Sequence, residues 1–441
     1  MLLPLVTVSE RDAETLRKLS VLGFVVAHVP HEQLELLINA DEATLKEQQA
    51  ALKQALLSTR TIAGPFGVEQ MAVAISWLDQ GLRMVLVDAA SSDESELQSV
   101  ATAISELPAN RVVIRLPVDI DALSSESYAL EIQDKIQRLK KRLEVCFKFE
   151  NDVAYGAASN AVLTIRKGFD EGFLFGAQWE LEGVDASVVV SRVAGLHAKG
   201  VHIVASALPV VVNDSERTQF VDAGRAFVKC IRSDRPDGLI TTVVVDEAGV
   251  ALGLVYSSEE SILAAIESGR GVYYSRSRKG LWKKGESSGN VQQLIQLDLD
   301  CDSDALRFMV RQTGAGFCHL NTRTCWGESG GLQHLQSQLE SRLREAPEGS
   351  YTKRLFNDPV LLRNKLVEEA QELAEAETHS DVAGEAADVM YFAMVRCVAA
   401  GVGLTDVENK LDMRALKVKR RPGNSKAYRI EAANEILKQQ K

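Results

Sequence analysis

Asp298-Leu-Asp-Cys-Asp-Ser-Asp304 is the most informative stretch of the 441-residue chain. Acidic residues alternate with other residues along it, and in an extended strand alternate side chains point to the same face. The pattern therefore predicts that Asp300, Asp302 and Asp304 project to one side and Cys301 to the other. Carboxylates are hard ligands that suit Mg²⁺, whereas thiolates suit zinc. Two kinds of metal site are expected at this part of the fold.

Two more thiols follow within a short distance. Cys301, Cys318 and Cys325 fall in a window of 25 residues, whereas the other three of the six cysteines are scattered. Three thiolates leave the fourth tetrahedral position of zinc for water, as in catalytic zinc sites. Zinc lowers the pKa of bound water from about 15.7 toward 7, and a neighbouring base can then move its proton. His319, next to Cys318, is the candidate for that catalytic role.

The surrounding segments resemble a known family. With Gly271-Val-Tyr-Tyr-Ser-Arg-Ser-Arg278 and Leu281-Trp-Lys-Lys-Gly-Glu-Ser-Ser-Gly289, the acids and thiols are similar to phosphoribosyl-AMP cyclohydrolases over roughly Arg232–Glu328. The departures from the family pattern are Ser303, where glycine is frequent, and Leu320-Asn321 after the Cys-His pair. Neither departure changes an expected ligand.

The resemblance implies a homodimer with a shared zinc site, in which Cys301 of one chain meets Cys318 and Cys325 of the other. It also implies that the three alternating aspartates bind Mg²⁺ and that two segments hold the phosphate and ribose of the substrate. Arg276 and Arg278 suit phosphate because a guanidinium is a forked donor. The expected substrate contacts are Ser275, Arg276, Ser277, Arg278, Trp282, Lys284, Gly285, Glu286, Ser287 and Gly289.

Two acidic segments downstream predict a second metal site. Lys365-Leu-Val-Glu-Glu-Ala-Gln-Glu372 and Glu385-Ala-Ala-Asp388 have helical spacing, so in an antiparallel hairpin their carboxylates converge. Such a cluster repels itself unless divalent cations fill it, and Mg²⁺ is the natural occupant beside phosphates. A metal-oriented water would attack phosphorus, with one carboxylate, Glu369, as the catalytic base. The expected magnesium ligands are Glu368, Glu369, Glu372, Glu385 and Asp388.

The acidic pattern also resembles a family. Glu-Glu-x-x-Glu, twelve residues and then Glu-x-x-Asp is typical of all-helical nucleoside triphosphate pyrophosphohydrolases. Gly349-Ser-Tyr-Thr-Lys-Arg-Leu355 resembles the phosphoribosyl-ATP branch, and the similarity spans about Leu332–Arg421. Hydroxyls and an ammonium on the approach to a helix suit an anion, although helix capping is the alternative there. The expected substrate contacts are Ser350, Tyr351, Thr352, Lys353 and Lys365.

The first 230 residues alternate short apolar runs with amphipathic stretches, which predicts an α/β domain, either barrel-like or an open doubly wound sheet. Strands are expected at Val21–Val29, Met84–Asp88, Arg111–Leu116, Ala161–Ile165 and Val201–Ala205, and helices at Val68–Gln80 and Ala129–Val145. The region has no Gly-rich phosphate loop at a strand end, which favours a structural or assembly role.

A turn-rich segment, Arg232–Leu239, suggests a boundary. The predicted domains are an α/β domain of unknown role (1–230), an α+β cyclohydrolase domain (231–330), an all-α pyrophosphohydrolase domain (331–425) and a C-terminal tail (426–441). In the second domain, strands are expected at Ile240–Asp246, Leu252–Ser257 and Gly271–Ser275, and a helix at Glu260–Ser268. In the third, helices are expected at Leu332–Arg344, Pro359–Thr378, Val382–Ala400 and Leu404–Ala415.

Composition and charge exclude several classes of protein. A net charge of −11 disfavours a nucleic-acid partner, because such binding needs many basic contacts to phosphate, and Lys417–Arg421 is expected to be a solvated helix end. The start of the chain lacks the features of a targeting segment, and no run approaches a membrane span. Six cysteines are too few for a secreted disulfide scaffold, so a cytoplasmic, reduced protein is expected.

The two resemblances together imply a nucleotide-binding, bifunctional hydrolase of histidine biosynthesis, similar to the leading part of the fungal-type trifunctional proteins. It would cleave phosphoribosyl-ATP to phosphoribosyl-AMP and pyrophosphate, and then open the purine ring. Because the chain has 441 residues, two activities without a histidinol dehydrogenase are expected. The alternatives are a zinc nucleotide deaminase fused to a general pyrophosphohydrolase, and a non-enzymatic protein with structural zinc. A deaminase should carry a glutamate two residues after a ligand histidine, and none stands near Cys318.

Overall fold

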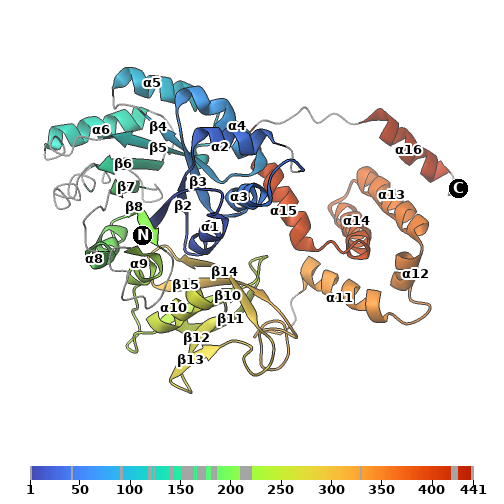
Figure 1. Ribbon diagram of the computed structural model, residues 1–441. Helices are drawn as coiled ribbons and strands as arrows, with labels where there is room; N and C mark the ends of the chain where they lie inside the picture. The colour runs from blue at the N-terminus through green and yellow to red at the C-terminus, as the bar shows by residue number, and fades with distance from the viewer. Residues whose placement is uncertain are drawn as a thin grey trace. The chain divides into compact units, whose positions relative to one another are not determined.

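The computed structural model describes residues 2–40, 43–89, 93–117, 122, 125–138, 144–149, 163, 165, 175–179, 186–208, 221–327, 330–418 and 426–438. These residues form two compact units. The first comprises Met1–Asn321 with Leu416–Val418, and the second comprises Thr322–Ala415 with Lys419–Lys441. The first unit contains two sheets, and the second is helical (Figure 1).

A parallel barrel occupies the first part of unit 1. Each strand pairs in parallel with the next, and β8 also pairs with β1, where Leu2 lies opposite Ile203. Of the two arrangements that the sequence left open, the pairing is that of a barrel, and a short β9 (Val221–Asp222) extends from β8. The barrel strands are β1 (Leu2–Thr7), β2 (Val25–His28), β3 (Thr61–Phe66), β4 (Met84–Asp88), β5 (Val112–Pro117), β6 (Glu144–Phe149), β7 (Phe175–Trp179) and β8 (Val201–Leu208).

Helices connect the barrel strands and lie outside them (Figure 1). In β1 to β5 and in β8, residues of one face belong to the large apolar cluster shared with these helices, and residues of the other face form a separate small cluster that includes Leu3, Val26 and Ile62. This two-sided burial explains why the strands read as short continuous apolar runs. The helices are α1 (Ala13–Ser20), α2 (His31–Asn39), α3 (Glu47–Ser58), α4 (Met71–Gln80), α5 (Glu94–Ala103), α6 (Glu126–Arg138), α8 (Ala186–His197) and α9 (Ala223–Lys229), with 3₁₀ turns η1 (Val68–Gln70) and η2 (Ala109–Arg111).

Three expected elements of the barrel differ from the structure. The strand predicted at Val21–Val29 begins only at Val25, because Val21–Gly23 form the turn after α1. The helix predicted at Ala129–Val145 ends at Arg138, and its last residues belong to β6. The strand predicted at Ala161–Ile165 lies mostly outside the described residues, and the two residues described there are helical.

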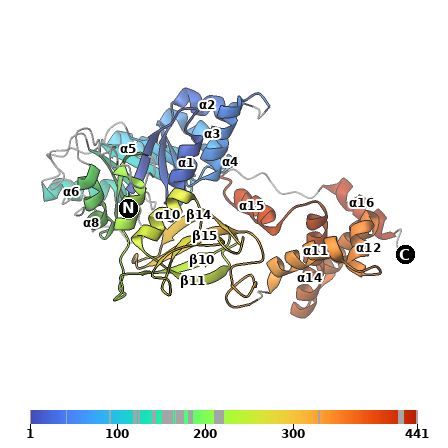
Figure 2. The same ribbon diagram turned by 60° about the horizontal axis from the view of Figure 1, so that its bottom comes forward.

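The second sheet of unit 1 has six strands in the order β13-β12-β11-β10-β15-β14. Only β10 and β15 pair in parallel; the other neighbours are antiparallel. Figure 2 shows β14, β15, β10 and β11 side by side. The elements are β10 (Ile240–Val245), β11 (Ala251–Ser257), α10 (Glu259–Ser268), β12 (Val272–Ser275), β13 (Gly280–Lys283), β14 (Gln292–Leu299) and β15 (Ala305–Gln312).

The second unit is all helical and has its own apolar core, which includes Leu339, Leu355, Phe392 and Val395. The helices are α11 (Gly331–Glu345), α12 (Tyr351–Asn357), α13 (Pro359–Glu375), α14 (His379–Ala399), α15 (Leu404–Ala415) and α16 (Ala427–Lys438). The segment expected to be a tail thus contains a helix. Asp358, with proline following it, caps α13, and Thr378 caps α14.

Among the described residues, no single helix is long and apolar enough to cross a membrane. Only α14 and α15 taken together meet the length and composition criteria, and they are bent by 108° relative to each other.

Candidate functional site

The first acidic cluster lies in a turn of unit 1. Asp300, Asp302 and Asp304 each offer a carboxylate oxygen, and these oxygens all lie within 4.8 Å of one another. The like charges raise the pKa of Asp304, with Asp302 as the main cause and Asp300 contributing. A cluster that repels itself in this way fits a divalent cation, because oxygen ligands of this kind satisfy Mg²⁺.

The structure corrects the backbone geometry from which this cluster was predicted. The aspartates were expected on one face of an extended strand, but β14 ends at Leu299 and β15 begins at Ala305. Asp300 Oδ1 accepts hydrogen bonds from the backbone N–H groups of Asp304 and Ala305, both at 3.0 Å. Ser303 has φ 67°, a left-handed conformation that explains the frequent glycine at this position in the family. A turn, and not strand alternation, brings the carboxylates together.

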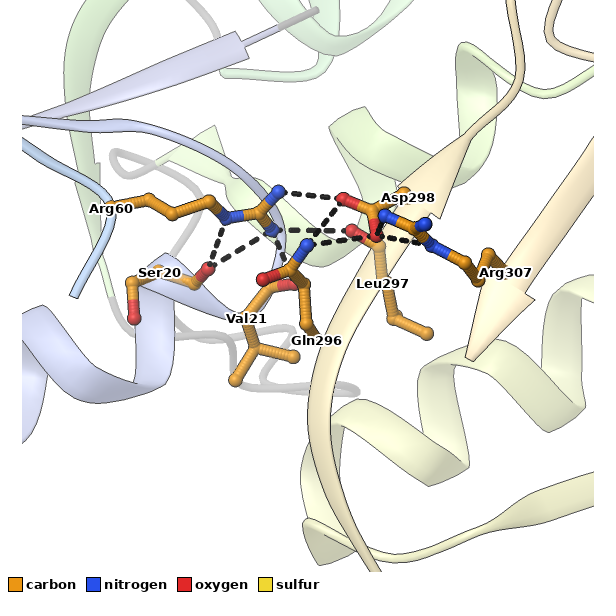
Figure 3. Close-up of polar contacts among 7 residues, drawn as sticks. All are labelled: Ser20, Val21, Arg60, Gln296, Leu297, Asp298 and Arg307. Atoms are coloured by element: carbon orange, nitrogen blue, oxygen red, sulfur yellow. Dashed lines mark hydrogen bonds and ion pairs between the residues drawn. The ribbon is translucent and has the colours of Figure 1, made fainter. Parts of the chain in front are cut away.

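Asp298 does not join this cluster, although it continues the alternating pattern. Its Oδ1 accepts from Arg60 Nη1 at 2.6 Å, and its Oδ2 accepts from Arg307 Nη2 at 2.8 Å and Nε at 3.0 Å (Figure 3). Gln296 Nε2 contacts both oxygens at 2.8 Å. Burial raises the pKa of Asp298, but Arg60, Arg307 and Gln296 outweigh it and hold the pKa below its ordinary value. Asp298 is therefore an ionised structural carboxylate.

The three expected zinc ligands form no disulfide, and they differ in environment. Cys301 is exposed in the aspartate turn, and its Sγ lies 3.9 Å from Asp302 Oδ1. Cys318 is buried, with its Sγ 3.8 Å from Nδ1 of the exposed His319. Cys325 belongs to unit 2 and is exposed. In the described part of the single chain, groups of three or more ligand atoms within 4.8 Å contain carboxylates and no thiol.

The expected phosphate-binding residues lie on the hairpin of β12 and β13. Ser275 Oγ accepts from the N–H of Arg278 at 3.3 Å and lies 3.2 Å from Ser277 Oγ, so both hydroxyls line the turn. The Arg276 guanidinium stacks on the Tyr256 ring at 4.2 Å, and Arg235 stacks on the same ring at 4.4 Å. Stacking limits the conformations of Arg276 while leaving its donors at an exposed position.

The segment after β13 combines buried and exposed members of the expected set. Lys284 is 8% exposed, and its Nζ lies 5.3 Å from the Phe317 ring centroid and 5.9 Å from that of Trp282. Glu286 and Ser287 are exposed. The sequence offered no signal for Tyr256, Arg235 or Phe317, because their contacts join segments that are distant in the chain.

Gly285 and Gly289 were both expected at the substrate, but the structure separates their roles. Gly285 has φ 84°, and a Cβ there would lie 2.5 Å from backbone atoms of Asn290. Gly289 has φ 74° and open space around it. We expect Gly285→Ala to lower the free energy of unfolding by about 2–4 kcal/mol, against about 1–2 kcal/mol for Gly289→Ala, which adds only left-handed strain. Thermal unfolding of both variants measures the difference, and equal losses would contradict the close approach.

The second acidic cluster lies between α13 and α14 of unit 2. Ligand oxygens of Glu369, Glu385 and Asp388 all lie within 4.8 Å of one another. Of the five expected magnesium ligands, these three are brought together. Glu368 pairs with Lys365 at 3.1 Å, and Glu372 is exposed. Desolvation and then the carboxylates of Glu369 and Glu385 raise the pKa of Glu372, which indicates that it faces the same cluster.

Lys365 supplies the positive charge next to the buried carboxylate. Its Nζ lies 2.7 Å from Glu369 Oε1, and Glu369 is 6% exposed. Desolvation lowers the pKa of Lys365, but its hydrogen bonds to Glu369 and Glu368 outweigh that effect and raise the pKa above its ordinary value. The ammonium is also 5.6 Å from the Phe392 ring centroid. Lys365 therefore offsets part of the negative charge of the cluster.

Replacing Lys365 with methionine should destabilise unit 2, because Glu369 would remain buried without its counter-charge. We expect a loss of about 1–3 kcal/mol in chelator-containing buffer, below the range for a fully buried pair because Lys365 is partly exposed. Lys410→Met, on the exposed face of α15, should change stability by no more than about 0.5 kcal/mol. Chemical denaturation measures both variants. If Lys365→Met lowered stability by the same amount in a protein that already carries Glu369→Gln, the pairing of Lys365 with Glu369 would be contradicted.

The segment before the acidic helices forms α12, which the sequence did not predict. Ser350 caps this helix by accepting from the N–H of Lys353 at 3.5 Å. Thr352 is 3% exposed, and its Oγ1 lies 3.1 Å from Tyr391 Oη and accepts from Arg342 Nη1 at 3.2 Å. Tyr351 is 47% exposed. The Ser350 contact is helix capping, which the sequence left open as the alternative to anion binding for this segment.

Comparison with known proteins matches both clusters to hydrolase families. Residues 253–327 match the family model of phosphoribosyl-AMP cyclohydrolase, and residues 332–415 match that of phosphoribosyl-ATP pyrophosphohydrolase. The chain is 35% identical over 196 residues to the histidine biosynthesis bifunctional protein HisIE of Vibrio vulnificus, covering 42% of this chain and 92% of that protein. The chain belongs to this bifunctional family. The resemblance drawn from the two sets of motifs is confirmed.

Fungal members of the family are also similar. The chain is 58% identical over 197 residues to the histidine biosynthesis trifunctional protein of Saccharomyces cerevisiae, covering 44% of this chain and 25% of that protein. It is 52% identical over 217 residues to the histidine biosynthesis bifunctional protein of Schizosaccharomyces pombe, covering 49% of this chain and 52% of that protein. The matched region thus spans between a quarter and about half of these fungal relatives.

Proposed function

We propose that the chain catalyses two successive hydrolyses in histidine biosynthesis. Unit 2 would cleave phosphoribosyl-ATP to phosphoribosyl-AMP and pyrophosphate, and the cyclohydrolase domain would open the purine ring of phosphoribosyl-AMP. One observation carries the proposal: two acidic clusters are assembled in two separate units, and each lies in a region that matches one of the two hydrolase families. We also propose that the protein is located in the cytoplasm.

For pyrophosphate release, the carboxylates of α13 and α14 would hold Mg²⁺, which neutralises charge on the phosphates. Glu369, Glu385 and Asp388 supply oxygens at close range, and Glu368 and Glu372 stand beside them. We assign Glu369 as the general base, because it is the buried member of the group of three carboxylates and accepts from Lys365. Lys365 would contact a substrate phosphate, together with groups at the start of α12.

For ring opening, Cys301, Cys318 and Cys325 would hold zinc, which acts as a Lewis acid toward water. His319 would move the proton, since its Nδ1 already lies 3.8 Å from a proposed ligand sulfur. The aspartate turn would hold Mg²⁺, and Arg276 and Arg278 would donate to the substrate phosphate. The substrate contacts would be completed by Trp282, Lys284, Gly285, Glu286, Ser287 and Gly289.

A homodimer with shared zinc is part of the same proposal. No thiol joins a three-ligand group within the described part of one chain, as expected if a second copy supplies part of the site. Large apolar side chains of the cyclohydrolase domain are open to solvent: Leu320, next to His319, is 71% exposed, and Leu254 on β11 is 50% exposed. A second copy would cover such surface.

The test is incubation of the purified chain with phosphoribosyl-ATP, zinc and magnesium, following pyrophosphate release and ring opening separately. The proposal expects pyrophosphate first and the ring-opened product afterwards. Removing zinc with a chelator should stop only the second signal, and adding zinc back should restore it. Binding of zinc with neither product would favour the alternative of a structural zinc protein, and deaminated nucleotide would favour the deaminase alternative.

A further inference from the structure

A barrel side chain reaches into the cyclohydrolase sheet within unit 1. Arg60, which precedes β3, donates from Nη1 to Asp298 Oδ1 at 2.6 Å and from Nη2 to the Leu297 carbonyl at 3.2 Å (Figure 3). The same guanidinium donates to the carbonyls of Ser20 and Val21 at 3.2 Å. Arg60 therefore ties the end of α1 to the last residues of β14.

This contact is more than a surface ion pair. The side chains of Arg60 and Asp298 are 22% and 18% exposed, and the backbone N–H of Leu297 also donates to the Val21 carbonyl at 2.8 Å. A guanidinium that uses several donors of its planar fork fixes both position and orientation of its partner. The strand that leads directly into the aspartate turn is thus held by the barrel through backbone and side-chain bonds.

The barrel holds the turn at a second point. Ser303 is 6% exposed, and its Oγ lies 2.9 Å from Nε2 of His197 at the end of α8. The Ser303 carbonyl accepts from the N–H of Arg232 at 2.8 Å. Burial lowers the pKa of His197 to about 4, so the ring is neutral at pH 7 and adds no charge beside the aspartates.

Three of the proposed metal ligands lie between these two anchors in the sequence. Asp300, Cys301 and Asp302 follow the Arg60 contact and precede the His197 contact. Neither anchor belongs to the candidate group of metal ligands, so each would act on an ion by positioning the turn and not as a ligand. Residues that orient metal ligands in this manner control affinity, because a site held in its binding geometry loses less conformational freedom when the ion binds.

We propose that the barrel serves as a positioning element for the metal-binding turn of the cyclohydrolase domain, with Arg60 and His197 as its positioning residues. This inference rests on the proposed ring-opening function. It gives a role to the first 230 residues, which lie outside both matched family regions. The barrel then contributes to ring opening without contacting the substrate.

The test compares full-length Arg60→Gln, Arg60→Lys and His197→Phe with wild type. Five quantities are measured on each: zinc affinity by competition with a chelator, kcat for ring opening, KM for ring opening, pyrophosphate release by unit 2, and the unfolding temperature. Lys18→Gln is the matched control, since Lys18 is a barrel cation in an exposed pair with Glu14 on α1. Pyrophosphate release serves as an internal reference within the same molecule.

Arg60→Gln and His197→Phe should each weaken zinc binding and lower kcat for ring opening by about 10- to 100-fold, as loss of ligand-orienting groups does. KM and pyrophosphate release should stay within about twofold of wild type. Lys18→Gln should leave zinc affinity and all rates within about twofold of wild type and the unfolding temperature unchanged. Arg60→Lys should recover part of the loss, because it keeps the charge toward Asp298 but not the fork. Combining Arg60→Gln with Asp298→Asn should add little to the more damaging single change.

A lower unfolding temperature with unchanged zinc affinity and kcat in Arg60→Gln and His197→Phe would overturn the inference, because the contacts would then be merely structural. Failure of the proposed function is distinguishable, since in that case the wild-type chain itself would not open the ring.

Discussion

Cys318→Ser is expected to abolish ring opening while sparing pyrophosphate release. A hydroxyl is a poor zinc ligand beside two thiolates, so the site would lose its ion or hold it in the wrong geometry. We expect the ring-opening rate to fall by more than about a thousandfold, equivalent to more than about 4 kcal/mol of transition-state stabilisation. Pyrophosphate release should remain near wild type, because the helical cluster lies in a separate unit.

The two products are measured in one reaction mixture containing phosphoribosyl-ATP. Cys397→Ser is the matched control, since Cys397 is a free, partly exposed thiol on α14 outside both clusters. It should leave both rates unchanged. If Cys318→Ser lost both activities, or neither, the assignment of this thiol to a separate zinc site would be wrong.

Glu369→Gln is expected to have the opposite effect. The amide keeps the size of the side chain but removes the charge of the buried member of the helical cluster, which is also the base assigned there. Pyrophosphate release should fall by about 10²- to 10⁴-fold, the range for loss of a positioned acid–base group. Ring opening of added phosphoribosyl-AMP should continue at the wild-type rate.

Glu375→Gln is the control for the second experiment. Glu375 is an exposed acid near the end of the same helix, where it pairs with Gln371, and its change should alter neither rate. Loss of ring opening from added phosphoribosyl-AMP in Glu369→Gln would contradict two independent sites. Retention of full pyrophosphate release would remove Glu369 from the mechanism.

Residue types and local spacing were enough to predict most of the helical site, both its helices and its converging acids. Helical periodicity is a local property, so α15 was predicted at its observed bounds, Leu404–Ala415, and α13 and α14 nearly so. The spacing also predicted that acids on two neighbouring helices converge, and Glu369, Glu385 and Asp388 do so. Which of the five acids approach most closely depends on how the two helices pack, and local spacing does not contain that information.

The aspartate turn shows why a correct grouping can follow from a wrong local structure. Alternating acids indicate one face of a strand, yet the same residues cluster in a turn. The positive φ of Ser303 allows the chain to reverse direction there. Asp298 fits the alternation equally well, but its ionised carboxylate pairs with Arg60, which lies 238 residues away in the chain. No local pattern distinguishes a carboxylate that binds metal from one that binds such a distant arginine.

The barrel illustrates the same limit at the level of topology. Apolar runs predicted strands and an α/β rhythm, and β4 was predicted at Met84–Asp88 as observed. Closure depends on the pairing of β1 with β8, which joins the two ends of a 200-residue region. An open sheet of the same strands has the same apolar pattern, so the sequence left both arrangements open.

The most direct test of the account is the zinc content of the purified chain and its dependence on the three thiols. The account predicts about one zinc ion per chain, lost in each of Cys301→Ser, Cys318→Ser and Cys325→Ser. Substitution by Co²⁺ should give the absorption of a thiolate-bound ion in the wild type. A chain that opens the ring without zinc, or that keeps its zinc when these cysteines are replaced, would contradict the account.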